Sequence, residues 1–193
     1  RTPSSSEHGL VFFRQNAAGE WAVDSHIPFE SLTLFPKGFL PTAIDLKSDR
    51  LIVAFVTGKI DGQVLVQIYQ RVDGAQDPLW ELEGEFRFGY GRELAPKPIV
   101  LLNRNSTMAF VSGLSAISQS PRNLRAEVAV LSYDLEGHRW QQHQRLYPFD
   151  GQIDDSFGHA LTVDGNILVV GAPRAGHQRF FDSVLQCFSK TCK

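Results

Sequence analysis

The stretch DDSFGHALTVDGNILVVGAP, residues 154–173, decides the fold, because it reads as a β-hairpin framed by two glycine motifs. Two short apolar runs flank an Asp-Gly-Asn turn at residues 164–166, and such a turn needs the positive φ that glycine adopts readily. A Phe-Gly pair precedes the hairpin, and Gly-Ala-Pro ends it. The same order of apolar run, polar turn and apolar run occurs at residues 42–56 and 98–113. The hairpin is therefore the third copy of a repeated unit.

Three tryptophans give the length of that unit. Trp21, Trp80 and Trp140 are 59 and 60 residues apart, and each follows a run with the alternation of a strand. Each unit then holds four short strands, namely the hairpin, a third strand and the strand that starts at the tryptophan. We expect the three tryptophans to occupy equivalent positions in successive units and to pack between sheets.

Four antiparallel strands that recur at this spacing are typical of a β-propeller blade. The sequence shows no amphipathic helix, and β-branched and aromatic residues fill the runs, so the predicted fold class is all-β. A single sheet of four strands buries only part of its apolar surface, so neighbouring blades must pack face to face. A β-sandwich is the alternative, but it would not require tryptophan at a nearly constant spacing.

The predicted strands divide the single segment 1–193 into four parts. They are a partial blade at 9–29, complete blades at 39–89 and 95–149, and a partial blade at 154–188. Two, four, four and three strands make a little over three blades, whereas closed propellers contain about four to eight. We therefore expect a segment of a larger propeller, whose remaining blades come from the same chain or from another one.

The last hairpin resembles the FG-GAP repeat of integrin-α-type propellers, which have seven blades. The residues that carry the likeness are Phe157, Gly158, Gly171, Ala172 and Pro173, with the third strand at Ser183-Val184-Leu185-Gln186-Cys187-Phe188. The match is strongest over 154–188 and degenerate in the earlier copies. The spacing of the copies fits this family better than WD40 or quinoprotein repeats, although YDLEGHRW at 133–140 is similar to the outer strands of quinoprotein and kelch propellers.

The sequence predicts neither a metal centre, nor a cofactor, nor a catalytic site. Several blades of the integrin-α type bind calcium in an Asp-rich loop between their first two strands. The corresponding turns here, DLKSDR, NRNST and VDGN, lack the three or more clustered oxygen ligands that calcium requires. The pair Asp154-Asp155 is interpreted as a loop that caps its own backbone. Serine, histidine and aspartate are all present, but no nucleophile elbow organises them.

Composition excludes two further classes of partner. A net charge of −2 gives no reason to expect nucleic acid or an anionic membrane surface. No apolar run approaches the roughly 20 residues that span a bilayer.

Three observations favour a secreted or cell-surface protein. The resemblance implies an extracellular setting, and a disulfide between Cys187 and Cys192 would close the C-terminal tail. Asn105-Ser106-Thr107 is an N-glycosylation sequon on a predicted hairpin turn. Cys187 on a strand is equally interpretable as a small core residue.

The motifs and the resemblance leave two functions from different classes. The first is a non-catalytic extracellular module for binding, adhesion or structural assembly, with a protein or glycan partner. The alternative is the accessory propeller portion of a secreted hydrolase of the phospholipase type, because FG-GAP-like repeats also accompany such enzymes.

Overall fold

All elements of regular structure described by the computed structural model are strands. The described residues are 9–28, 39–57, 63–72, 79–89, 97–116, 125–148, 156–173 and 184–187. The strands are β1 (Gly9–Gln15), β2 (Trp21–Pro28), β3 (Phe39–Lys47), β4 (Arg50–Thr57), β5 (Gln63–Val72), β6 (Leu79–Gly89), β7 (Val100–Leu102), β8 (Met108–Ala116), β9 (Arg125–Asp134), β10 (Arg139–Leu146), β11 (Ala160–Asp164), β12 (Ile167–Gly171) and β13 (Val184–Cys187).

The strands form four antiparallel sheets in which neighbours along the chain pair with each other. We call them sheet 1 (β1-β2), sheet 2 (β3-β4-β5-β6), sheet 3 (β7-β8-β9-β10) and sheet 4 (β11-β12-β13). The predicted pattern of two, four, four and three strands is thus confirmed. The Asp-Gly-Asn turn joins β11 to β12, and its Gly165 has a φ of +56°. The all-β class and the propeller-type blades are as predicted.

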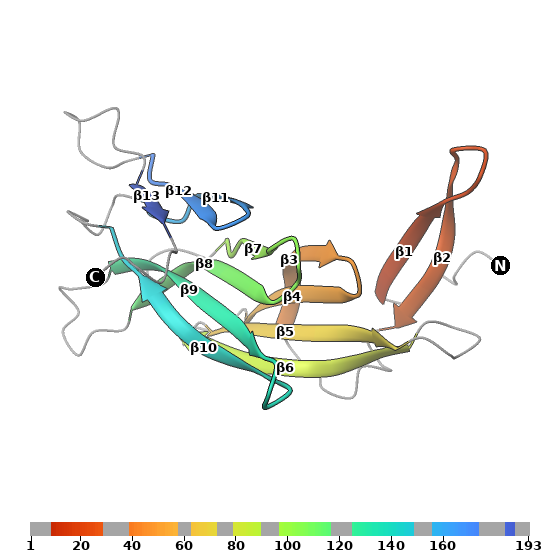
Figure 1. Cartoon of the computed structure of the whole chain (residues 1–193), viewed down its shortest axis with the longest axis horizontal. Helices are drawn as coiled ribbons and strands as arrows, with labels where there is room; N and C mark the ends of the chain where they lie inside the picture. Colours follow the sequence, from red (N-terminus) through yellow and green to blue (C-terminus); the bar gives the residue numbers. More distant parts are fainter. Residues whose placement is uncertain are drawn as a thin grey trace.

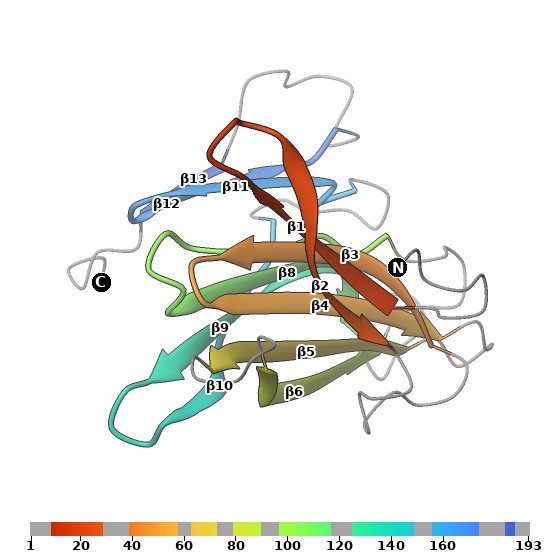
Figure 2. The same ribbon diagram turned by 90° about the vertical axis from the view of Figure 1, so that its right-hand side faces the viewer.

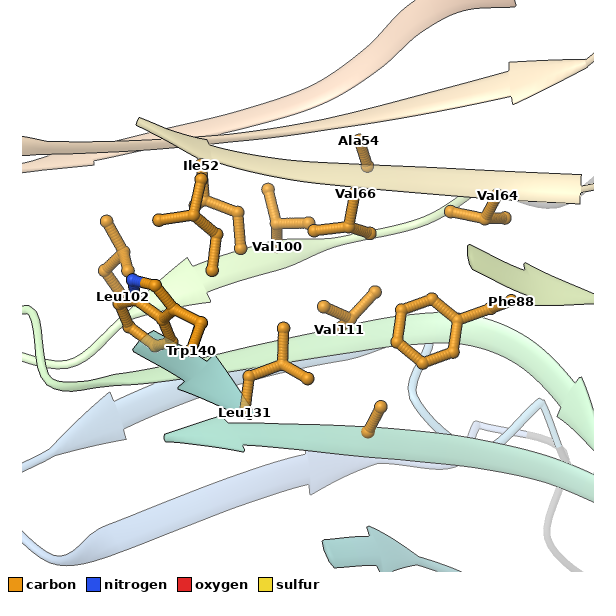
Figure 3. Close-up of a cluster of buried hydrophobic side chains, with 13 residues drawn as sticks. Ile52, Ala54, Val64, Val66, Phe88, Val100, Leu102, Val111, Leu131 and Trp140 are labelled. Atoms are coloured by element: carbon orange, nitrogen blue, oxygen red, sulfur yellow. The ribbon is translucent and has the colours of Figure 1, made fainter. Parts of the chain in front are cut away.

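The sheets stack face to face in chain order, from sheet 1 at the right of Figure 1 to sheet 4 at the upper left. Figure 2 looks along this stack with sheet 1 towards the viewer. One apolar core fills each of the three interfaces. The core between sheets 2 and 3 contains Ile52, Val66 and Phe88 from one side and Val111, Leu131 and Trp140 from the other (Figure 3). Each sheet therefore lies against its neighbour as a propeller blade does.

Burial on both faces explains the unbroken apolar runs of the two complete sheets. In β4, Leu51, Val53 and Phe55 face sheet 1, whereas Ile52 and Ala54 face sheet 3. Successive side chains of a strand point to opposite faces, so a strand covered on both sides needs apolar residues at every position.

The three tryptophans occupy equivalent positions. Trp21 is the first residue of β2, and Trp80 and Trp140 are the second residues of β6 and β10. Each pairs with a residue near the end of the preceding strand, Gln15, Arg71 or Tyr133. The prediction of equivalence is confirmed.

The prediction that all three pack between sheets is correct for two of them and wrong for Trp21. Trp140 is 6% exposed in the core between sheets 2 and 3. Trp80 stacks on Phe12 of sheet 1, with ring centroids 5.2 Å apart and an interplanar angle of 16°. Trp21 is 69% exposed, because no described strand covers its face of sheet 1.

This difference predicts different costs for removing each indole. Trp140→Ala should lower the free energy of unfolding by about 3–5 kcal/mol, since a large buried aromatic leaves a cavity. Trp21→Ala should change it by less than about 0.5 kcal/mol, as at other exposed sites. Urea denaturation of both variants beside the wild-type protein measures the two values, and equal losses would contradict the assignment of burial.

Candidate functional site

The residues of the FG-GAP-like motif meet at the interface between sheets 3 and 4. Phe157 is 4% exposed and lies in the core formed with Val128, Leu168 and Val170. Ala172 packs against the same core, whereas Pro173 is exposed. The phenylalanine therefore anchors the start of sheet 4 on sheet 3.

Position 158 requires glycine for two reasons, its backbone conformation and the closeness of Ser112. Its φ is +84°, and a Cβ built on it would lie 2.8 Å from the Cβ of Ser112. The Ser112 hydroxyl, which is buried, donates a hydrogen bond of 2.7 Å to the Gly158 carbonyl. This contact joins sheet 3 to sheet 4 through a residue that has no side chain to separate them.

The two halves of the motif are joined by backbone hydrogen bonds. The Gly171 carbonyl accepts from the amide of Gly158 at 3.0 Å and from the amide of His159 at 3.2 Å. Phe-Gly and Gly-Ala-Pro, which are separated by a whole hairpin in sequence, thus form one unit at the end of sheet 4.

A second polar junction joins sheets 2 and 3, and we call it the tryptophan latch: Arg50, Glu83, Gly84 and Trp140. The Arg50 guanidinium binds the Glu83 carboxylate at 2.7 and 3.0 Å, with two nitrogens on two oxygens. The indole nitrogen of Trp140 donates to the same carboxylate at 3.0 Å. A Cβ at Gly84 would lie 3.0 Å from the Cβ of Trp140, so glycine allows the indole to approach closely.

Glu83 reaches sheet 3 because it is the extra residue of a β-bulge. Ile68 pairs with Gly84 and Tyr69 with Leu82, so Glu83 has no opposite residue in β5. The other two outer strands carry the same irregularity at Asp24 and His143. In all three strands the extra residue comes three positions after the tryptophan.

The bulge changes the face to which the outer strand directs its apolar residues. Trp80 and Leu82 pack towards sheet 1, whereas Phe86 and Phe88 pack towards sheet 3. These four residues all hold even-numbered positions, and a regular strand would place them on one face. One inserted residue reverses the alternation. Sequence reasoning missed this device, and its one available signal was the polar residue that follows each tryptophan by three positions.

The charges of the latch stabilise each other. Burial disfavours the charged form of Glu83, but hydrogen bonds from Arg50 and Trp140 and the charge of Arg50 outweigh it, so the pKa of Glu83 is lowered. The hydrogen bond to Glu83 raises the pKa of Arg50 although burial opposes the shift. Arg50 also lies 4.3 Å from the ring centre of Tyr133.

The corresponding junction between sheets 1 and 2 is incomplete. Asp24 occupies the position of Glu83 but is one methylene shorter, and it is held by Arg14 at 2.7 Å within its own sheet. The indole nitrogen of Trp80 is buried, and no described residue accepts a hydrogen bond from it. Trp80 is accordingly held by its stacking on Phe12.

The remaining predicted sites are Asn105, the two cysteines and the Asp154-Asp155 pair. Asn105 is exposed at the β7–β8 turn, where buried Ser106 donates to the Lys47 carbonyl at 2.9 Å. Cys187 ends β13, but its side chain and Cys192 lie outside the described residues, so the disulfide stays a prediction. Asp154 and Asp155 also lie outside them.

The described part of the chain offers no cluster of metal ligands. Nowhere within it do three histidine, cysteine, aspartate or glutamate side chains gather closely enough to hold an ion. The described residues also include no helix that is long and apolar enough to cross a membrane.

The motif glycine gives a prediction with an internal control. Gly158→Ala should lower the free energy of unfolding by about 2 kcal/mol or more, because its backbone is left-handed and Ser112 leaves no room for a methyl group. Gly165→Ala has the same kind of backbone but meets nothing within 4 Å, so it should cost about 1 kcal/mol. Equal losses in denaturant titrations would show that the contact with Ser112 contributes nothing.

The latch predicts a pH dependence. Glu83→Gln should cost about 1–3 kcal/mol at neutral pH, because it leaves Arg50 without its charged partner. Because the pKa of Glu83 is lowered in the folded state, its carboxylate contributes stability at pH values above 4.5, the ordinary pKa of the group. This contribution is lost as the pH falls through the pKa of Glu83 in the folded protein. The difference between wild type and Glu83→Gln should therefore shrink below pH 4.5 in urea titrations. A difference that does not change with pH would contradict the role of the carboxylate charge.

Comparison with known proteins agrees with this geometry. The family model described as FG-GAP repeat matches residues 140–180, which include the tryptophan of β10 and the motif of sheet 4. The predicted resemblance is thereby confirmed over part of the chain. A comparison with curated proteins finds no match. Residues 140–180 of this stack of propeller-type blades thus match an FG-GAP repeat.

Proposed function

We propose that this chain is a non-catalytic module for extracellular binding, adhesion or assembly, built on FG-GAP-like propeller blades. The observation that supports it best is that residues of the FG-GAP-like motif lie at the interface between two blades. Phe157 and Gly158 join two blades through a buried ring and the hydrogen bond from Ser112, and the Gly171 carbonyl holds the motif together within sheet 4. The residues that carry the family likeness thus help to build the blade stack, which supports the proposal of a module whose surface binds a partner.

The exposure of Asn105 adds support for an extracellular setting. Its side chain points out from a turn that is fixed underneath by Ser106, and the Asn103 side chain accepts hydrogen bonds from the backbone of Thr107 and Met108. A glycan on Asn105 would project into solvent without disturbing the interface between sheets 2 and 3.

The test is secretion of the chain behind a signal peptide from mammalian cells. We expect a secreted protein that carries one glycan, which Asn105→Gln removes and Asn103→Gln leaves in place. The purified protein, immobilised on a surface, should support cell attachment above the level of its thermally denatured form. Retention inside the cell without glycan and without attachment would overturn the proposal. Hydrolysis of phospholipid vesicles by the polypeptide with its natural flanking sequence would favour the accessory role in a hydrolase instead.

A further inference from the structure

The turn between β11 and β12 carries a reactive pair of residues. Asp164 ends β11, Gly165 is the first residue of the turn, and both are exposed. A Cβ built on Gly165 would meet no atom within 4 Å, so the turn is open on the side of the glycine. The carboxyl group of an aspartate can close an imide ring with the amide nitrogen of the next residue. Glycine favours this ring closure, because it has no side chain to hinder the approach.

The strand register leaves the nitrogen of such a ring available. Asp164 pairs with Ile167 as the last pair of the ladder between β11 and β12. Gly165 and Asn166 therefore form a two-residue loop, and the amide of Gly165 lies outside the ladder. The φ of Gly165 is +56°, which glycine adopts without strain. The nitrogen and the carboxyl group thus belong to adjacent residues of one exposed turn.

Asp164 is the one aspartate among the described residues that is followed by glycine. The others are each followed by a residue with a side chain: Asp24, Asp45, Asp49 and Asp134. The Asp45 carboxylate also accepts a hydrogen bond from the Leu102 amide at 2.7 Å. The Asp134 carboxylate accepts one from the Glu136 amide at 3.1 Å. Larger neighbours and engaged carboxylates oppose ring closure at these sites.

We propose that Asp164-Gly165 is a site of spontaneous backbone isomerisation in the folded protein. The amide nitrogen of Gly165 loses its proton and bonds to Cγ of Asp164, and the carboxyl hydroxyl leaves with that proton as water. Water then opens the imide ring at either carbonyl. Breaking the bond between the nitrogen and Cγ restores aspartate. Breaking the bond between the nitrogen and the main-chain carbonyl carbon gives isoaspartate, so the water released in the first step is consumed in the second.

Isomerisation changes the hairpin that carries the FG-GAP-like motif. Isoaspartate adds one carbon atom to the main chain between Cα of Asp164 and the nitrogen of Gly165. The neighbouring pair of the ladder, Val163 and Leu168, contributes to the core between sheets 3 and 4. A longer main chain in a two-residue turn disturbs the register of these pairs. The isomerised protein should therefore unfold at a lower temperature than the unmodified protein.

The test incubates the purified whole chain in water that contains heavy oxygen, in mildly acidic buffer, because a protonated carboxyl group loses water more easily. Each cycle of ring closure and opening places one heavy oxygen atom in the residue. Mass spectrometry after digestion in ordinary water locates the label, and chymotryptic cleavage after Phe157 separates Asp164 from the Asp-Gly pair at 150–151. We expect Asp164 to take up label at least about tenfold faster than Asp49 or Asp134, because the next residue lacks a Cβ. Fragmentation by electron transfer then distinguishes isoaspartate from aspartate.

Asp164→Glu is the matched control. It keeps the negative charge and the glycine turn, but its side chain would close a larger ring, which forms far more slowly. This variant should lose the uptake of label at position 164 and should fold like the wild-type protein. The chain unfolded in urea supplies the reference rate, together with the further Asp-Gly pairs at 61–62, 73–74 and 150–151.

Three results would overturn the proposal. The first is uptake at Asp164 in urea but none in the folded protein, which would show that the turn prevents ring closure. The second is equal uptake in Asp164→Glu, which would assign the label to simple exchange of carboxyl oxygen. The third is uptake without isoaspartate, which would show that the ring reopens only to aspartate. None of these results depends on secretion, glycosylation or cell attachment, so the proposed function can fail or stand separately.

Discussion

The structure depends on one constraint: both faces of each inner sheet must be buried. Apolar burial contributes roughly 25 cal/mol per Å², and no helix among the described residues is available to cover a sheet. Each sheet is therefore covered by another sheet. The unbroken run Leu51 to Phe55 is the consequence, because its alternate residues enter two different cores.

The outer strands meet this constraint by changing face partway along their length. The inserted residue at Glu83 lets β6 direct Trp80 back to sheet 1 and Phe88 forward to sheet 3. The same residue supplies the carboxylate that binds Arg50 and the next tryptophan. A single irregularity thus reverses the side-chain alternation and places a charged group where the neighbouring sheet uses it.

The family likeness and the blade stack have a common physical basis. Phe157 fills the core between sheets 3 and 4, Gly158 brings the backbone against Ser112, and Gly171 closes the unit with its carbonyl. Phe157 and Gly158 thus act directly at the junction between two blades, and Gly171 holds their end of sheet 4 in place. These groups are buried between the sheets and are not part of the exposed surface.

The sequence by itself determined the strands, their grouping into hairpins and sheets, and the equivalent placement of the tryptophans. These features depend on local rules, namely side-chain alternation, turn chemistry and the spacing of the repeat. Only the tertiary structure decided the exposure of Trp21 and the partners of Glu83 and Ser112. Burial of Trp21 depends on whether another sheet faces it, and Glu83 binds Arg50 and Trp140, which lie 33 and 57 residues away. The sequence did not reveal the bulge in β6 for the same reason. Trp80, Leu82, Phe86 and Phe88 keep an even spacing in the sequence, and only their contacts with the neighbouring sheets show which face each residue occupies.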